Sequence, residues 1–458
     1  MLTVAVLAVM IAAAAAYVMV RGKAVAIAGS AYAQMHSRPS YHGLYSALWV
    51  LLAGMTTLTV LSVAGGAMTD ALLSNDISAA DPTLLRIEVQ RILSDAQAIA
   101  RGGIPTMTDP LRETIAVRFD TLETVRIGSS LALTAGAVAL AFLRTSGCVS
   151  MKFRARNRAE GIIRGALWAS AAVAVLTTIG IVLSLVGETL IFFDNIGWQV
   201  DDFLFGTTWS PLSGVSAGKM DPEKVGFLPL FVGTLLITTI AMLVAAPVGL
   251  FAAIYLSDFA SPTVRAWAKP MLEILAGIPT VVYGFFAAIT VAPFIRGMGE
   301  GIGLDVASES ALAAGLVMGI MIIPFVSSLS DDVINAVPQS LRDGSYGLGA
   351  TKAETIRQVV LPAALPGIVS ALLLGVSRAI GETMIVVMAA GQGANLTLNP
   401  LEAVTTVTVQ IVMLITGDTE ASVAAGPAFT LGFTLFCVTL ALNVIALRIV
   451  RKYREMYD

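Results

Sequence analysis

Charged residues are scarce in this sequence of 458 residues. Asp, Glu, Lys and Arg make up 13% of the chain and hydrophobic residues 56%, whereas an ordinary soluble domain is roughly 25% charged. This composition excludes a water-soluble globular protein and indicates a polytopic membrane protein, in agreement with a mean hydropathy of +0.83. The formal net charge of -3 gives no reason to expect nucleic-acid binding.

Residues that build covalent, metal-bound or nucleotide-binding sites are also few. Cys148 and Cys437 lie far apart, with no Cys-x-x-Cys pair or Cys/His cluster, so neither a disulfide framework nor a metal site is indicated. His36 and His42 flank the polar stretch SRPSY, where we expect solvated or interfacial side chains. The sequence lacks a Gly-x-x-x-x-Gly-Lys-Ser/Thr loop, so it does not hydrolyse ATP by that route. We expect no catalytic residue, no cofactor and no metal.

Long apolar runs dominate the remaining sequence. A bilayer-spanning helix needs about 20 mostly apolar residues. Such windows predict an all-α protein with nine spans, near residues 2–20, 44–68, 127–143, 163–186, 229–256, 270–295, 309–329, 363–390 and 427–448. The first run lacks the basic start of a signal peptide, so we expect an uncleaved span.

The distribution of Lys and Arg predicts the orientation. Cytoplasmic loops are enriched in these residues. The loop 144–164 carries six of them against one acid, Glu160, and the C-terminal end adds Arg448, Arg451, Lys452 and Arg454. The loop 391–426 has none. We therefore expect the N-terminus outside and the C-terminus in the cytoplasm.

The polar segment 69–126 lies between the second and third spans. Within it, RIEVQRILSDAQAIARG alternates apolar and charged residues with helical spacing, which predicts an amphipathic helix outside the membrane. Two interpretations stay open for this segment, an extramembrane cap or spacer and a docking surface for an external partner.

The stretch SRAIGETM, residues 377–384, places two charges inside the predicted span 363–390. Ionisable residues within a span are costly and mark candidate functional sites. On a continuous helix, Arg378 and Glu382 would share one face as an i, i+4 pair. The Arg378 guanidinium has donors for a tetrahedral oxyanion, and a carboxylate accepts a hydrogen bond from protonated phosphate but not from sulfate. The alternative is an interhelical ion pair with no substrate contact.

Charges and a proline near the span 270–295 carry less information. We expect Lys269 and Glu273 to snorkel or to form a helix-terminal ion pair, rather than to contact substrate. Pro279 lies inside the predicted span and should kink it, which is compatible with a gate.

The loop 331–362 is too polar to span a membrane and predicts two short helices. Pro338 fits the start of the first helix, and Gly347 or Gly349 fits a left-handed turn after it. Thr351 and Glu354 have the spacing of a capping box. Leu361 and Pro362 should end or kink the second helix.

This loop resembles the EAA motif of bacterial ABC importer permeases. The motif's spacing is met by Asp343, Gly344, Ser345, Gly349, Val359, Leu361 and Pro362. The first three residues differ from the Glu-Ala-Ala consensus, while the Gly and the Leu-Pro pair match it. The resemblance implies that the loop docks on a separate ATPase subunit and transmits its movement to the next span.

Residues 163–458 resemble, more closely, the PstC-type permeases of the high-affinity phosphate ABC importer. The resemblance is carried by SRAIGETM followed by VVMAAG, and by the stretches 233–260, 273–287 and 341–362. It implies a type I ABC importer permease in which Arg378 and Glu382 serve phosphate passage. Residues 160–458 would form the permease unit, with a core at about 229–448, and residues 1–150 an N-terminal extension with three further spans.

The resemblance also implies partners. These are a PstA-like permease, PstB-like ATPase subunits, a PstS-like phosphate-binding protein and membrane lipid, with inorganic phosphate as the substrate in a bacterial inner membrane. Two other functions stay open, a permease for another oxyanion and a membrane sensor or scaffold that regulates the phosphate response.

Overall fold

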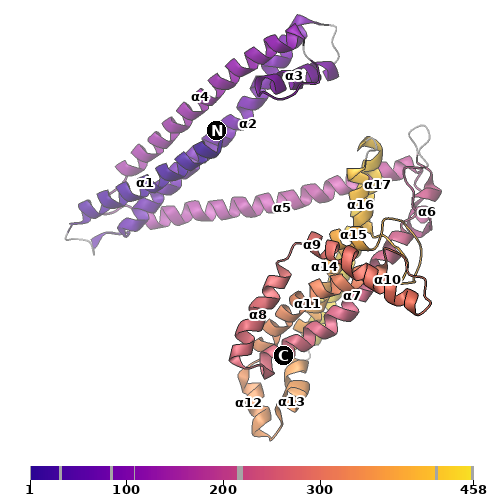
Figure 1. Ribbon diagram of the computed structural model, residues 1–458. Coiled ribbons are helices and arrows are strands. Elements are labelled where there is room, and N and C mark those ends of the chain that lie inside the picture. The colour runs from indigo at the N-terminus through magenta and orange to yellow at the C-terminus, as the bar shows by residue number, and fades with distance from the viewer. Residues whose placement is uncertain are drawn as a thin grey trace. The chain divides into compact units, whose positions relative to one another are not determined.

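The computed structural model describes residues 2–29, 34–82, 86–107, 109–213, 220–417 and 421–454. In these ranges the chain forms helices and loops, apart from an isolated β-bridge between Trp209 and Val225. Nine of the helices described there are long and apolar enough to cross a membrane, which confirms the expected number of spans. The chain divides into two compact units, Met1–Leu176 and Thr177–Asp458 (Figure 1), and each is described by itself.

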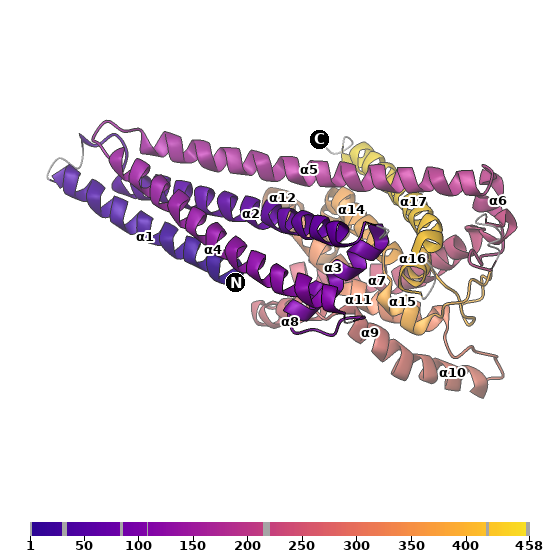
Figure 2. The same cartoon turned by 90° about the horizontal axis from the view of Figure 1, so that it is seen from above.

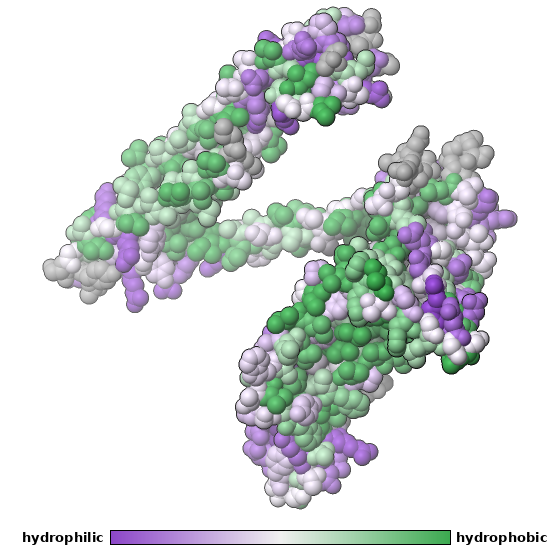
Figure 3. All heavy atoms as spheres, in the orientation of Figure 1, coloured by the Kyte–Doolittle hydropathy of each residue, from purple (hydrophilic) through white to green (hydrophobic). Residues whose placement is uncertain are grey.

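The surface of each unit fits a lipid environment. Figure 3 shows hydrophobic residues over the middle of both units and hydrophilic residues gathered at their ends. Large apolar side chains are exposed there, among them Leu243 and Phe251 of one spanning helix. Contiguous apolar surface of this kind is a liability in water but is the expected surface in a bilayer.

Four helices make up most of unit 1: α1 (Leu2–Ala28), α2 (Pro39–Ala80), α3 (Arg86–Ala100) and α4 (Pro110–Gly147). Both α1 and α4 pack on α2, and Figure 2 shows the three running side by side. Gly54 of α2 lies where they meet, because an added Cβ there would be 2.6 Å from Val9 and 3.0 Å from Val138. The glycine lets the three helices approach closely.

One end of unit 1 is a small cap around α3, which combines a buried apolar face with a hydrogen-bonded turn. This helix is the amphipathic helix that the sequence predicts, and its apolar face is buried between the ends of α2 and α4. The buried residues are Leu73, Ile77, Val89, Ile92, Ala96, Ile115, Ala116 and Phe119. Asp95 fastens the following turn, since it accepts hydrogen bonds from the Thr106 amide at 2.8 Å and from Arg112 Nε at 2.9 Å.

The opposite end of unit 1 corrects one expectation from the sequence. His42 is not solvated: it is 2% exposed and its ring lies 5.7 Å from that of Phe153. The neighbouring Ser46 is also buried and is hydrogen-bonded to Thr145 at 2.7 Å. The start of α2 is covered by the loop that follows α4, a contact between segments more than 100 residues apart. His36 is exposed, as expected.

The fifth helix, α5 (Ala155–Asn195), begins in unit 1 and ends in unit 2. It is apolar over most of its length, and every residue from 163 to 181 is exposed. A helix that is apolar on all sides needs lipid or other helices around it. This helix is therefore a spanning segment whose exposed apolar surface from residue 163 to 181 fits a lipid environment.

Unit 2 is built around α11 (Ala311–Ala336), which is the most buried of the candidate spans. Its closest neighbour is α7 (Leu228–Ile254), extended by a π-helical turn, η3 (Tyr255–Phe259). The other helices are α6 (Val200–Phe205), α8 (Pro262–Ala276), α9 (Thr280–Phe286), α10 (Ala292–Gly301), α12 (Gln339–Gly347), α13 (Lys352–Thr355), α14 (Leu361–Ile380), α15 (Met384–Ala389), α16 (Val407–Thr416) and α17 (Ala421–Arg454).

The predicted span 270–295 is wrong in its boundaries. The helix breaks after Ala276, and a new one begins at Thr280 with Pro279 as its N-cap residue, so the spanning stretch is 280–301. The reason is that Pro279 has no amide hydrogen for a helix running through from α8 and disfavours a helical Ile278. The expected kink is a complete break, and α8 is a separate helix.

We predict that Asp95→Asn loosens the cap around α3. The hydrogen bond from the Thr106 amide, aided by Arg112, lowers the pKa of the Asp95 carboxyl. A carboxyl group whose pKa is lowered by folding stabilises the fold at a pH above its pKa in the unfolded chain, about 3.9. This contribution is lost as the pH falls through its pKa in the folded protein. At pH 7 the amides of residues 101–107 should exchange hydrogen several-fold faster in the variant.

The difference between wild type and Asp95→Asn should begin to shrink as the pH falls below about 4 and should disappear only below the lowered pKa of the folded state, where both lack the charge. Asp120→Asn changes an exposed carboxylate on the same unit and should leave exchange at 101–107 unchanged. Equal exchange in Asp95→Asn and wild type at pH 7 would contradict the anchoring role of Asp95.

Candidate functional site

The structure separates Arg378 and Glu382, which the sequence places on one helix face. Helix α14 ends at Ile380, and Glu382 lies in the turn before α15. The Glu382 carboxylate accepts hydrogen bonds from the amides of Met384 at 3.0 Å and Ile385 at 3.3 Å. Capping of this kind starts a new helix and competes with continuation of the old one. The predicted continuous span 363–390, and with it the i, i+4 geometry, is wrong.

The two side chains also differ in exposure. Glu382 is 9% exposed, and its position is fixed by the two amides. Arg378 is exposed, with its guanidinium carbon 5.5 Å from the centre of the Phe325 ring. Within the described residues the two form no ion pair. The Arg378 guanidinium therefore lies at the end of α14, about one turn before Glu382. The Glu382 carboxylate is held by backbone amides and does not neutralise the guanidinium.

Helix α16 braces the break from the other side. Thr408 donates a hydrogen bond to the Glu382 carbonyl at 3.0 Å. Gln410 is buried, accepts from Trp209 Nε1 at 3.0 Å and donates to the Gln392 carbonyl at 2.8 Å. Sequence reasoning missed these residues, because a Thr and a Gln in an apolar run carry no signal until their distant partners are known.

The loop 331–362 has the predicted helix-turn-helix form. Gly349 has a φ of 86°, in the left-handed region that glycine tolerates best. The capping box of Thr351 and Glu354 is confirmed in both directions. Ser345 of α12 is buried and its hydroxyl is hydrogen-bonded to that of Thr355 at 2.8 Å, which closes the two short helices on each other.

The motif residues of this loop fall into exposed and structural groups. Asp343 and Gly344 are exposed on α12, and Asp343 accepts a hydrogen bond from Gln339 at 3.0 Å. Val359 lies in a π-helical turn, η5 (Ile356–Val360), and Leu361 and Pro362 begin α14. The helix does not end at Leu361 and Pro362, so one of the two expectations for this pair is wrong. The π turn absorbs the proline, so the helix runs on from Lys352 to Ile380.

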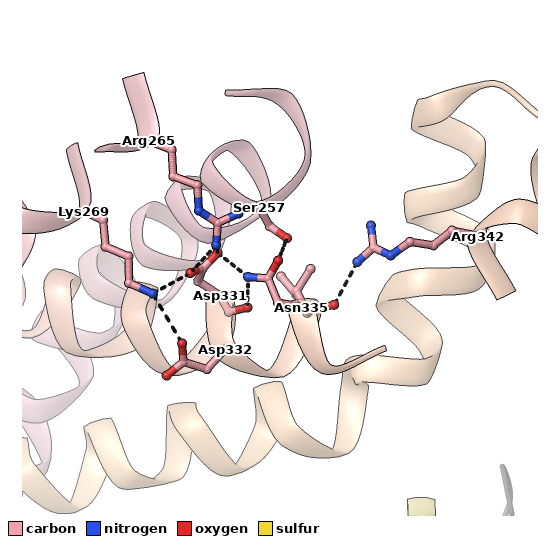
Figure 4. A network of polar contacts seen from close by, with 8 residues as sticks. Ser257, Arg265, Lys269, Asp331, Asp332, Asn335 and Arg342 are labelled. Carbon is pink, nitrogen blue, oxygen red and sulfur yellow. Dashed lines mark hydrogen bonds and ion pairs between the residues drawn. The ribbon is translucent and has the colours of Figure 1, made fainter. Parts of the chain in front are cut away.

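A polar cluster lies at the same end of unit 2, between α8, α11 and η3 (Figure 4). Its centre is Asp331, which is 2% exposed. Arg265 Nη2 lies 3.1 Å from both carboxylate oxygens, and Lys269 Nζ lies 3.0 Å from Oδ2. Asn335 Nδ2 donates to Oδ1 at 2.8 Å. We call Arg265, Lys269, Asp331 and Asn335 the Asp331 cluster.

Lys269 forms an ion pair, but from the middle of α8 and with Asp331 and Asp332 of α11, so the pair is not helix-terminal on α8. The hydrogen bond to Asp331 raises the pKa of Lys269, with Asp332 adding to the effect. Asp331 itself was missed, because its two cations lie more than 60 residues away in the sequence.

Two further contacts connect the Asp331 cluster to the loop 331–362. Ser257 of η3 donates a hydrogen bond to Asn335 at 3.2 Å, and the adjacent Asp258 is paired with Arg342 of α12. Arg342 also donates to the Ile334 carbonyl at 2.8 Å. The buried arginine thus holds α12 against both η3 and the end of α11.

Comparisons with known proteins agree with this architecture. The family described as "Binding-protein-dependent transport system inner membrane component" matches residues 245–455. A second family, described as "Phosphate ATP-binding cassette transporter", matches residues 6–177.

The matches to individual relatives extend over most of each relative's length. A probable ABC transporter permease protein, YqgH, of Bacillus subtilis is 33% identical over 306 residues, which are 66% of this chain and 94% of the relative. A phosphate transport system permease protein, PstC, of Mesorhizobium japonicum is 30% identical over 305 residues, 60% of this chain and 86% of the relative. A chain in a crystal structure of a bacterial alginate ABC transporter aligns over 64% of this chain and 97% of its own, with 17% identity and a TM-score of 0.45.

This chain belongs to the inner membrane components of binding-protein-dependent transport systems, the permease subunits of ABC importers. Within that class it belongs to the phosphate transport system permeases of the PstC type. It is a multi-pass membrane protein and a transport component, not an enzyme. A permease of this family works with ATPase and substrate-binding protein partners.

We predict that Arg342→Gln destabilises unit 2. The change leaves the buried Asp258 without its cation, which costs about 3 kcal/mol for a broken buried pair. The melting temperature of the purified protein should fall accordingly. The double variant Asp258→Asn/Arg342→Gln should recover much of the loss, since no charge is then left buried.

Gln339→Ala is the matched control on the same helix. Gln339 is exposed, so its replacement should change stability by less than about 0.5 kcal/mol. If Arg342→Gln melts like wild type, the pair with Asp258 does not hold α12 in place.

Proposed function

We propose that this chain is the subunit through which an ATP-driven importer passes inorganic phosphate across the inner membrane, and that Arg378 and Glu382 lie on the phosphate path. The observation that carries the proposal is the exposed guanidinium of Arg378 at the end of α14, with the fixed carboxylate of Glu382 just beyond it. A charged side chain within a spanning helix is costly unless it serves a path or a partner.

The chemistry of the two groups fits phosphate. The planar guanidinium offers several N–H donors to a tetrahedral oxyanion. Phosphate carries at least one proton at neutral pH and can donate it to a carboxylate, whereas sulfate cannot. Because the amides of Met384 and Ile385 engage one oxygen of Glu382, Oε1, the carboxylate keeps acceptor capacity on its other oxygen.

The family to which the chain belongs supports the proposed partners. A PstA-like permease would complete the path as the second half of a heterodimer, and a PstS-like protein would deliver phosphate from outside. PstB-like ATPase subunits would bind the loop 331–362, where Asp343 and Gly344 are exposed on α12. The N-terminus then lies outside and the C-terminus in the cytoplasm. Residues 1–150 form an extension to the permease unit, residues 160–458.

We predict that Arg378→Gln reduces phosphate uptake by vesicles that contain the complete importer. Loss of hydrogen bonds from a charged donor costs about 2 kcal/mol, which is roughly thirtyfold in rate or affinity. Arg378→Lys should recover little, because an ammonium lacks the planar fork. Glu382→Gln should narrow the preference for phosphate over sulfate, measured as inhibition of uptake by added sulfate.

Arg448→Gln removes another exposed arginine, near the end of α17, and should transport like wild type. Normal uptake by Arg378→Gln would place the path elsewhere. Sulfate competing as strongly as phosphate in the wild type would indicate a permease for another oxyanion. An assembled wild-type complex that moves no oxyanion would indicate a sensor or scaffold.

A further inference from the structure

Helix α8 is attached to the rest of unit 2 by polar contacts and by the partly buried Leu275, which packs against the main core. None of its side chains, from Pro262 to Ala276, is buried. Its two basic residues, Arg265 and Lys269, both reach the buried carboxylate of Asp331. Two positive charges on successive turns of one helix thus meet one negative charge of its neighbour. The place of α8 beside α11 therefore depends on Asp331 in addition to the packing of Leu275.

The same carboxylate is reached from α12. Arg342 pairs with Asp258 of η3, the adjacent Ser257 donates to Asn335, and Asn335 donates to Asp331. Asp258 and Ser257 are neighbours in the chain, and every other step is a contact within hydrogen-bonding distance. Figure 4 shows these polar contacts between α12 and the cations of α8, which give a displacement of α12 a route to α8.

A cavity of about 220 Å³ borders the cluster between α8 and α11. Lys269, Asp331, Glu273, Ser327 and Phe325 are among its lining residues. Phe325 is also the ring that lies under Arg378. The charged side chains that line the cavity are one cation and two carboxylates, and this excess of negative charge disfavours the binding of an anion there. The cavity instead gives α8 room to move against α11 next to the residue that supports Arg378.

Lys269 has two carboxylates within reach. Its Nζ lies 3.0 Å from buried Asp331 and 3.4 Å from exposed Asp332, one residue further along α11. A small shift of α8 can exchange one partner for the other without leaving the ammonium unpaired. Such an element with two arrangements is what transmission between distant sites requires.

We propose that Asp331 is a positioning residue of the transport cycle, the joint through which movement of the loop 331–362 reaches α8 and the Phe325–Arg378 contact. The inference rests on the proposed function, since it assigns the ATPase-driven movement to that loop. Asp331 touches no substrate. Asp331 determines the positions of α8 and of the helix break at Gly277–Pro279 when the loop moves.

The test is the number of ATP molecules hydrolysed per phosphate taken up. It uses vesicles with the complete importer, including the ATPase, the partner permease and the binding protein. Asp331→Asn keeps the shape of the side chain and removes its charge. We expect ATP hydrolysis to continue while uptake falls, so that the ratio rises roughly tenfold, within the range of allosteric couplings.

A second variant and a control separate this role from a general loss of structure. Lys269→Gln should raise the ratio too, and the double variant Asp331→Asn/Lys269→Gln should raise it by less than the product of the two single effects, because both act through one contact. Glu273→Gln is the matched control, since Glu273 lies on α8 and lines the same cavity outside the cluster. It should leave the ratio unchanged.

The inference is overturned if Asp331→Asn and wild type have the same ratio, or if hydrolysis and uptake fall in equal proportion. A wild-type complex that takes up no phosphate would refute the proposed function instead. In that case the role of Asp331 is tested by hydrogen exchange of the α8 amides in the assembled complex. Asp331→Asn should accelerate this exchange about tenfold, at the same degree of coupling. Glu273→Gln should leave the exchange unchanged. Unchanged exchange in Asp331→Asn overturns the joint.

Discussion

The carboxylate of Asp331 is buried at one end of α11, where a charge without a partner is strongly unfavourable. Arg265 and Lys269 offset that cost from α8, and Asn335 adds a donor from the next turn of α11. Removing one partner from a buried pair typically costs about 3–5 kcal/mol. Because α8 has no fully buried side chain and only Leu275 packs against the main core, this electrostatic requirement helps to give α8 a defined place in unit 2.

The rest of the site is arranged by polar contacts at the ends of helices. Arg342 ties α12 to η3 and to the end of α11, and the π turn η5 joins the loop 331–362 to α14 without a break. At the far end of α14, Glu382 caps the next helix and leaves Arg378 exposed. A rigid element thus runs from the loop to the arginine, while the Asp331 cluster gives the loop a second connection, through α8 and Phe325, to the same arginine.

The sequence alone predicts the features that depend on local chemistry. Nine apolar runs, the capping box of Thr351 and Glu354 and the left-handed turn at Gly349 are all present. Its errors arise where a local cue competes with a longer pattern: hydropathy runs through Gly381, but the carboxylate of Glu382 starts a new helix there. The Asp331 cluster could not be predicted, since a single sequence does not reveal that residues 265 and 331 meet.

The central claim is that movement of the loop 331–362 reaches the end of α14. It is tested most directly by a cysteine reporter at Ser377→Cys, beside Arg378, in a chain where Cys148 and Cys437 are replaced by Ala. The measurement is the rate of thiol modification in the assembled importer, first without nucleotide and then with ATP trapped on the ATPase. The account predicts rates that differ several-fold between the two states. Equal rates in both states would contradict it.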